Sequence, residues 1–192
     1  MRWNLKRTVD PVSAPVSVDE VKDQSRITES AENALVNRLI NAAVESIEGP
    51  YGIGVCLEEQ TWELALDCFP SRILIPLYPV ISVESIEYED TNGVTQTVAD
   101  SVYRVDTHSN PARITQDPSE FWPATRDAAN AVTVTFKAGY PNGAPEDLKH
   151  AIIMLAAHWY ENREAAIIGT SATETPMAVN SILDRYRVMA VG

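Results

Sequence analysis

The order of hydrophobic periodicities along the chain limits its fold more than any other feature. Apolar residues recur at three- and four-residue spacings over residues 29–48, at every second residue over 61–69 and 131–138, and at helical spacing again over 145–163. The outer patterns are typical of amphipathic helices and the middle ones of half-buried strands. Because the strands form one block instead of alternating with helices, the sequence predicts an α+β fold.

The N-terminal helical part is predicted to span residues 16–50. Ser17 stands three residues before Glu20 as in a capping box, and Val16 and Val21 occupy the positions of a hydrophobic staple. A second, longer helix should follow from about residue 29 and stop at Gly49-Pro50.

The β block is predicted to span residues 55–140. Its clearest signals are the alternation over residues 61–69, the Asn92-Gly93 pair of a tight hairpin turn, and the alternation over 131–138. The prolines near residues 73–75 indicate an edge position or turns there, because proline cannot donate a hydrogen bond to a neighbouring strand.

The C-terminal helices and tail segment are predicted to span residues 144–192. Pro145 suits the first turn of a helix that runs to about Arg163; residues 169–175 should form a mobile loop, and a short last helix begins near Met177. We expect residues 1–192 to form a single domain. Its core would be made by the N- and C-terminal helices, with the antiparallel β block inserted between them.

Charge and hydropathy exclude several functions. The chain has 15 Lys and Arg against 27 Asp and Glu, a formal charge of −12, which disfavours specific binding to nucleic-acid phosphates. No apolar run approaches the roughly 20 residues of a membrane span, and the first residues do not resemble a signal peptide. We therefore expect a soluble protein made in the cytoplasm.

The sequence contains no recognisable catalytic, metal or cofactor motif. Cys56 and Cys68 are too few for a zinc site, and His108, His150 and His158 lack the spacing of a zinc-binding helix. No nucleophile elbow or phosphate-binding loop occurs. We therefore predict that the protein is not an enzyme and holds no metal or cofactor, although an acidic pair in a small hydrolase stays open as an alternative.

Several stretches together resemble the head-tail connector (adaptor) family of bacteriophages, prophages and gene transfer agents. They are residues 15–20 (PVSVDE), 60–64 (QTWEL), 103–106 (YRVD), 122–126 (WPATR), 132–140 (VTVTFKAGY), 158–164 (HWYENRE) and 176–187 (PMAVNSILDRYR). The resemblance covers nearly the whole chain. None of these stretches is a catalytic signature, so the match depends on their order and joint presence.

The resemblance implies a structural virion protein of the particle's neck, assembled in the bacterial host cytoplasm. Family members form a closed ring, typically a dodecamer, between the portal protein and a stopper or tail protein, and DNA passes through its lumen without specific binding. A ring of such acidic subunits would repel DNA phosphates wherever its charge faces the lumen. A tail-completion or stopper protein is the neighbouring alternative.

The last predicted helix is the candidate partner-binding segment. It is amphipathic, carries two arginines and follows a predicted loop, so its apolar face could pack against a neighbouring protein. The alternative is that it folds back onto its own core. The candidate residues are Met177, Val179, Ile182, Leu183, Arg185, Tyr186 and Arg187.

Overall fold

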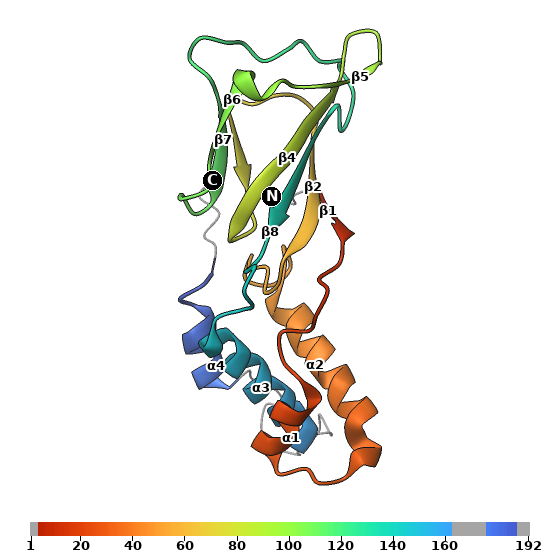
Figure 1. The fold of residues 1–192 in the computed structure, drawn as a ribbon, viewed down its shortest axis with the longest axis vertical. Helices are drawn as coiled ribbons and strands as arrows, with labels where there is room; N and C mark the ends of the chain where they lie inside the picture. The colour runs from red at the N-terminus through yellow and green to blue at the C-terminus, as the bar shows by residue number, and fades with distance from the viewer. Residues whose placement is uncertain (1–3, 163–175, 188–192) are drawn as a thin grey trace, which may run out of the picture.

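The buried side chains form two separate hydrophobic cores, one among the helices and one between two β-sheets. The computed structural model describes residues 4–162 and 176–187. In this part of the chain the molecule is elongated, with the helices at one end of the long axis and the sheets at the other (Figure 1). The α+β class predicted from the sequence is confirmed.

The helical end is built from segments that lie before and after most of the strands. They are α1 (Val18–Ser25), the 3-10 turn η1 (Ser30–Glu32), α2 (Asn33–Ile47), α3 (Glu146–Glu161) and α4 (Met177–Leu183). The predicted capping box is present, because the Glu20 N–H donates to the Ser17 hydroxyl and the Ser17 N–H donates to the Glu20 carboxylate. The buried stripes of α2 and α3, which include Ile40 and Ile152, face one another across the helical core.

The β end consists of two antiparallel sheets packed over the second core. The five-stranded sheet has the order β1 (Asn4–Val9), β2 (Gln60–Leu66), β8 (Val132–Ala138), β4 (Val80–Glu89) and β5 (Thr95–Thr97). The three-stranded sheet has the order β3 (Arg72–Ile75), β7 (Ala112–Gln116) and β6 (Tyr103–Asp106), and the short turn η2 (Asp100–Val102) precedes β6. Phe136 and Ile114 are fully buried between the two sheets.

One expectation about the architecture needs correction, because the helices are not the terminal elements. The described chain begins with strand β1, which pairs with β2 in the register Leu5 with Leu64. The sheet therefore includes a strand from before the first helix, so it is not simply a block inserted between terminal helices. Residues of β1 other than Leu5 are exposed, which explains why the sequence shows no alternation there.

Two glycines fix the connections at the β end. Gly93 has φ +79° in the hairpin between β4 and β5, as the Asn-Gly pair predicted. Gly139 has φ +120° after β8, and a Cβ there would lie 1.9 Å from the carbonyl oxygen of Glu58. The end of β8 can therefore approach the segment before β2 only with glycine at this position.

Some of the predicted C-terminal elements fall on residues that the structure does not describe. The predicted loop at 169–175 and the end of the last predicted helix beyond residue 187 lie outside the described residues. Among the helices of residues 4–162 and 176–187, none has the length and hydropathy needed to cross a membrane.

Candidate functional site

The candidate partner-binding helix lies against the chain's own helical core. Val179 and Leu183 are buried there, and Ile182 and Tyr186 are partly buried against it. This packing is the alternative in which the helix folds back. Met177, with 89% of its surface exposed, is the one large apolar residue among the candidates that stays accessible.

Asp147, near the start of α3, holds the end of α4 in place. The Tyr186 hydroxyl donates to one carboxylate oxygen at 2.7 Å, and the Arg185 guanidinium lies 3.2 Å from the other. The hydrogen bond to the carboxylate raises the pKa of Tyr186. Arg187 pairs only with its neighbour Asp184 in the described part of the chain. Two of the seven candidate residues, Arg185 and Tyr186, therefore bind Asp147 of α3, and the seven do not form one site.

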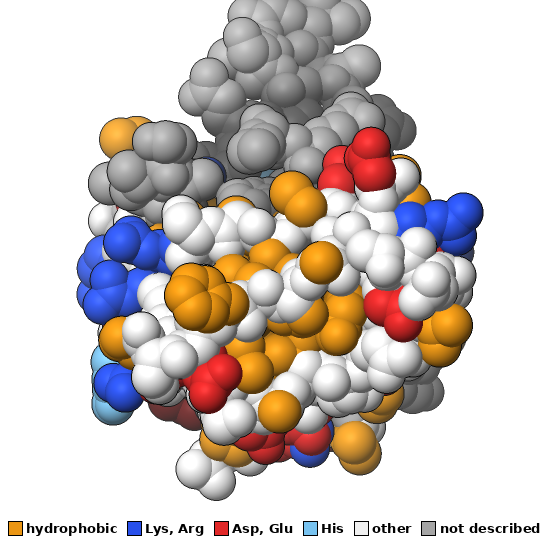
Figure 2. Space-filling model, turned by 90° about the horizontal axis from the view of Figure 1, so that it is seen from above, with side chains coloured by type: hydrophobic (Ala, Val, Ile, Leu, Met, Phe, Trp, Pro, Cys, Tyr) orange, Lys and Arg blue, Asp and Glu red, His pale blue; other side chains and the backbone are white. Residues whose placement is uncertain are grey.

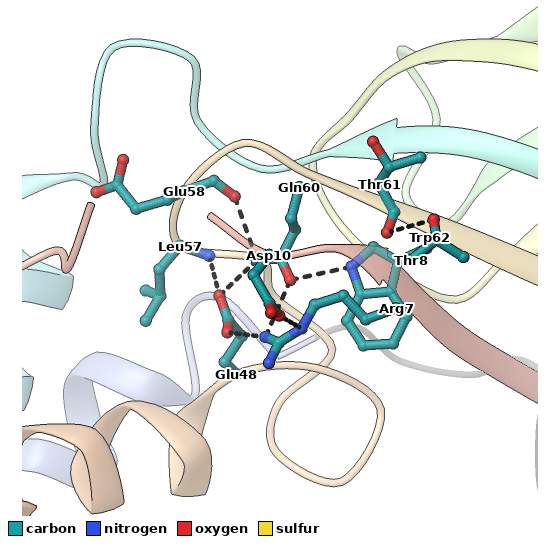
Figure 3. Close-up of polar contacts among 9 residues, drawn as sticks. All are labelled: Arg7, Thr8, Asp10, Glu48, Leu57, Glu58, Gln60, Thr61 and Trp62. Atoms are coloured by element: carbon teal, nitrogen blue, oxygen red, sulfur yellow. Dashed lines mark hydrogen bonds and ion pairs between the residues drawn. The ribbon is translucent and has the colours of Figure 1, made fainter. Parts of the chain in front are cut away.

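A polar network joins the helical end to the β end (Figure 3). Glu48 follows the last residue of α2, and its carboxylate accepts hydrogen bonds from the Leu57 N–H at 2.9 Å and from the Gln60 side-chain amide at 2.7 Å. Its second oxygen lies 3.3 Å from the Arg7 guanidinium of β1. One carboxylate thus ties helix α2, strand β1 and the start of strand β2 together.

Gln60 is the centre of this network, and it is a buried polar residue with only 1% of its surface exposed. Its amide oxygen accepts a hydrogen bond from the Trp62 indole N–H at 3.1 Å, and the Arg7 guanidinium lies over the Trp62 ring at 5.9 Å. A buried amide is tolerated when its donors and acceptor are satisfied, as they are here. Its two central charged groups, Arg7 and Glu48, pair with each other, which favours a structural role for the arrangement.

The residues that could carry chemistry are dispersed. In the described part of the chain, no three His, Cys, Asp or Glu residues come together as a metal site would require. Burial raises the pKa of the Cys56 thiol, which opposes a nucleophilic role, while Cys68 is exposed. An open hollow of about 570 Å³ lies beside the chain segment that follows β1; it is lined by Glu59 and Lys137, which pair at 3.9 Å.

The end of the molecule farthest from the helices exposes apolar side chains. Figure 2 looks onto this end and shows hydrophobic side chains gathered at its centre. Phe121 is 85% exposed, and the ring of the next residue, Trp122, stacks on Phe69 with the centroids 4.5 Å apart. Exposed apolar patches of this kind are typical of protein interaction surfaces.

The fold and these surfaces are typical of a structural protein that works through contacts with other proteins. The chain belongs to the head completion protein family, whose family model matches residues 15–189. This finding confirms the family predicted from the sequence stretches. No curated protein matches the chain.

Solved structures match nearly the full length of the chain. A protein in the neck of an empty gene transfer agent particle, computed with C6 symmetry, is 26% identical, with a TM-score of 0.76 over 97% of this chain and 96% of that one. A protein of the native gene transfer agent virion is 24% identical, with a TM-score of 0.77 over 98% and 97%. A third, in a native neck computed with C12 symmetry, is 23% identical, with a TM-score of 0.69 over 96% and 97%. The last two show the shared fold alone.

Proposed function

We propose that the chain is a structural head-tail connector (adaptor) subunit, which forms a ring that joins a portal to a tail or stopper and lets DNA pass. The observation that carries the proposal is the full-length match to a protein of a gene transfer agent neck at 26% identity, together with the family match over residues 15–189. The proposal places the ring in the neck of a virion, after assembly in the host cytoplasm.

The proposed ring contains twelve copies. The C12 symmetry of the neck that holds a relative with the same fold supports this number. Cyclic rings of identical subunits use heterologous contacts, in which one face of a subunit meets a different face of the next. The formal charge of −12 would be repeated in each copy, and we infer that this charge lets DNA pass the lumen without binding.

The proposal assigns no catalysis and no cofactor to the chain. Membership in the head completion protein family supports a structural role. The paired state of the junction groups and the raised pKa of Cys56 agree with that assignment.

The C-terminal helix is proposed to contact the portal through its accessible residues. Met177 tests this role, because its exposed side chain can be changed without disturbing the core. Met177→Asp should keep the fold and weaken portal binding. Val179→Asp serves for comparison, because it places a charge in the helical core and should unfold α4. It shows how much portal binding is lost when the helix itself is lost. Portal binding by Met177→Asp equal to that of the wild type would remove α4 from the proposed interface.

The function is tested by mixing the purified chain with the portal protein encoded beside it. Native mass measurement and negative-stain imaging should show a ring on the portal, whether or not the free chain is a monomer. A chain that stays monomeric and ignores the portal would contradict the connector role. Binding only to an already formed connector ring would instead identify a stopper.

A further inference from the structure

The three-stranded sheet presents an arginine face to the outside of the molecule. Arg72 and Arg104 both lie in register with Thr115, so the three residues form one row across the sheet. Arg113 stands two residues along β7 from Thr115, on the same face. The alternating residue Ile114 is fully buried, which confirms that this row points away from the core. Figure 2 shows Lys and Arg side chains gathered on the side where β6 and β7 lie.

These arginines are accessible. The side chain of Arg104 is 69% exposed and that of Arg113 is 43% exposed, although each also pairs with an aspartate. Arg72 is exposed and has no ion pair within the part of the chain that the structure describes. A concentration of arginine on one face is unusual in a chain with a formal charge of −12.

The five-stranded sheet presents an outward face with small, acidic and two basic side chains. Lys6 lies in register with Glu63, and Lys137 pairs with Glu84 at 3.9 Å. Glu63 and Thr135 lie in register on β2 and β8, and Thr133 and Glu87 lie in register on β8 and β4. The threonine pair runs down the centre of the sheet. Because the inward neighbours Leu64 and Val134 are buried, these four residues point outward.

Each face also carries one exposed charge without an ion pair in the described part of the chain, Arg72 on one and Glu87 on the other. The two faces lie on opposite sides of one pair of packed sheets, since each sheet turns its other side to the shared core. Long guanidinium groups on one face could reach over short threonine side chains on the other and pair with glutamates. Two different faces that match one another on opposite sides of a subunit are what a head-to-tail ring requires.

We propose that the arginine face of one copy, carrying Arg72, Arg104 and Arg113, binds the glutamate face of the next copy, carrying Glu63 and Glu87, and that this contact closes the ring. The inference rests on the proposed connector function and adds the surfaces that would form the ring. A second copy suits the arginine face better than DNA does, because two of its three arginines already have aspartate partners and the chain as a whole is acidic.

Two charge-reversal variants test the contact. Arg72→Glu with Arg104→Glu makes both faces acidic, and Glu63→Arg with Glu87→Arg makes both basic. Each variant alone should lose ring formation on the portal by about tenfold or more, because like charges then meet at every contact. An equimolar mixture should restore an even-numbered ring in which the two variants alternate. Native mass spectrometry distinguishes this ring by its composition.

The matched control is Arg26→Glu with Arg38→Glu, which makes the same charge change on exposed positions of the helical end. This control should form rings as the wild type does, and circular dichroism should show that all three variants are folded. The proposed contact is overturned if the arginine-face variant assembles normally, if the control loses assembly equally, or if the folded variants do not restore a ring when mixed.

Two further outcomes separate the possible explanations. If the arginine-face variant keeps the ring but loses binding to a duplex DNA probe, the face belongs to nucleic acid and the contact between copies is wrong. If the wild type itself forms no ring on the portal, the connector function fails first. A wild-type ring with unaffected variants refutes only the contact between the arginine face and the glutamate face.

Discussion

Replacing Glu48 by alanine should destabilise the whole protein, because its carboxylate is the common acceptor at the junction of the two cores. The side chain is only 8% exposed. Its removal leaves the buried Leu57 N–H without a partner, which costs about 1–3 kcal/mol. Gln60 loses its shorter hydrogen bond but keeps a 3.2 Å bond to the Glu58 carbonyl oxygen, so we assign it about 1 kcal/mol.

The Arg7 ion pair adds little, because its guanidinium is 39% exposed and surface pairs are worth about 0–1 kcal/mol. The expected total for Glu48→Ala is about 2–5 kcal/mol, a large part of the roughly 5–15 kcal/mol that stabilises a typical domain. Glu48→Gln keeps an acceptor oxygen and nearly the same shape, so it should cost only about 1 kcal/mol.

Urea unfolding followed by far-ultraviolet circular dichroism and by tryptophan fluorescence measures these free energies. Glu45→Ala is the matched control, since this residue is exposed one turn earlier on α2 and should change stability by less than about 0.5 kcal/mol. A Glu48→Ala variant as stable as the control would refute the reasoning. If residues 1–192 form one domain, as we predict, the two signals should also follow a single transition.

Three further predictions concern stability in acid, the reactivity of the two cysteines and the space around Gly139. The hydrogen bond from the Ser109 hydroxyl lowers the pKa of Asp106 to about 2, so its contribution to stability is complete above pH about 4 and is lost as pH falls toward 2. The difference in melting temperature between wild type and Asp106→Asn should therefore shrink over that interval; a constant difference would contradict it. Cys68 should react with a thiol reagent in the folded protein, whereas the buried Cys56 should react only after unfolding; equal rates would contradict the burial. Gly139→Ala should destabilise the chain by about 2 kcal/mol or more in urea unfolding, because its φ and the near carbonyl leave no room for Cβ; an unchanged midpoint would show that the backbone relaxes.

The elements with strong local signals could be predicted from the sequence. The capping box at Ser17 and the turn at Gly93 each depend on a few neighbouring residues, and both are present. Strand β1 was missed because it is an edge strand that buries almost nothing, so its residues carry no alternation. Strand β7 was missed because Ala112 and Ile114 are its only buried apolar residues.

The candidate surfaces depend on pairings between distant residues, which sequence periodicity does not contain. Arg72 and Arg104 become neighbours only because β7 lies between β3 and β6 in the sheet. The sequence did predict an amphipathic last helix, but amphipathicity alone cannot tell whether the apolar face meets the chain's own core or a partner. Val179 packs in the chain's own helical core, and the partner-binding role of the helix stays a prediction.

The separation of the two cores has a consequence for how this chain can diverge. No buried residue is shared between them, and effects of substitutions at well-separated sites are usually additive. A lineage can therefore remodel the exposed apolar end of the sheets to suit a new neighbour without compensating changes among the helices. The small polar junction around Gln60 joins the two ends, so substitutions there are the ones that affect both.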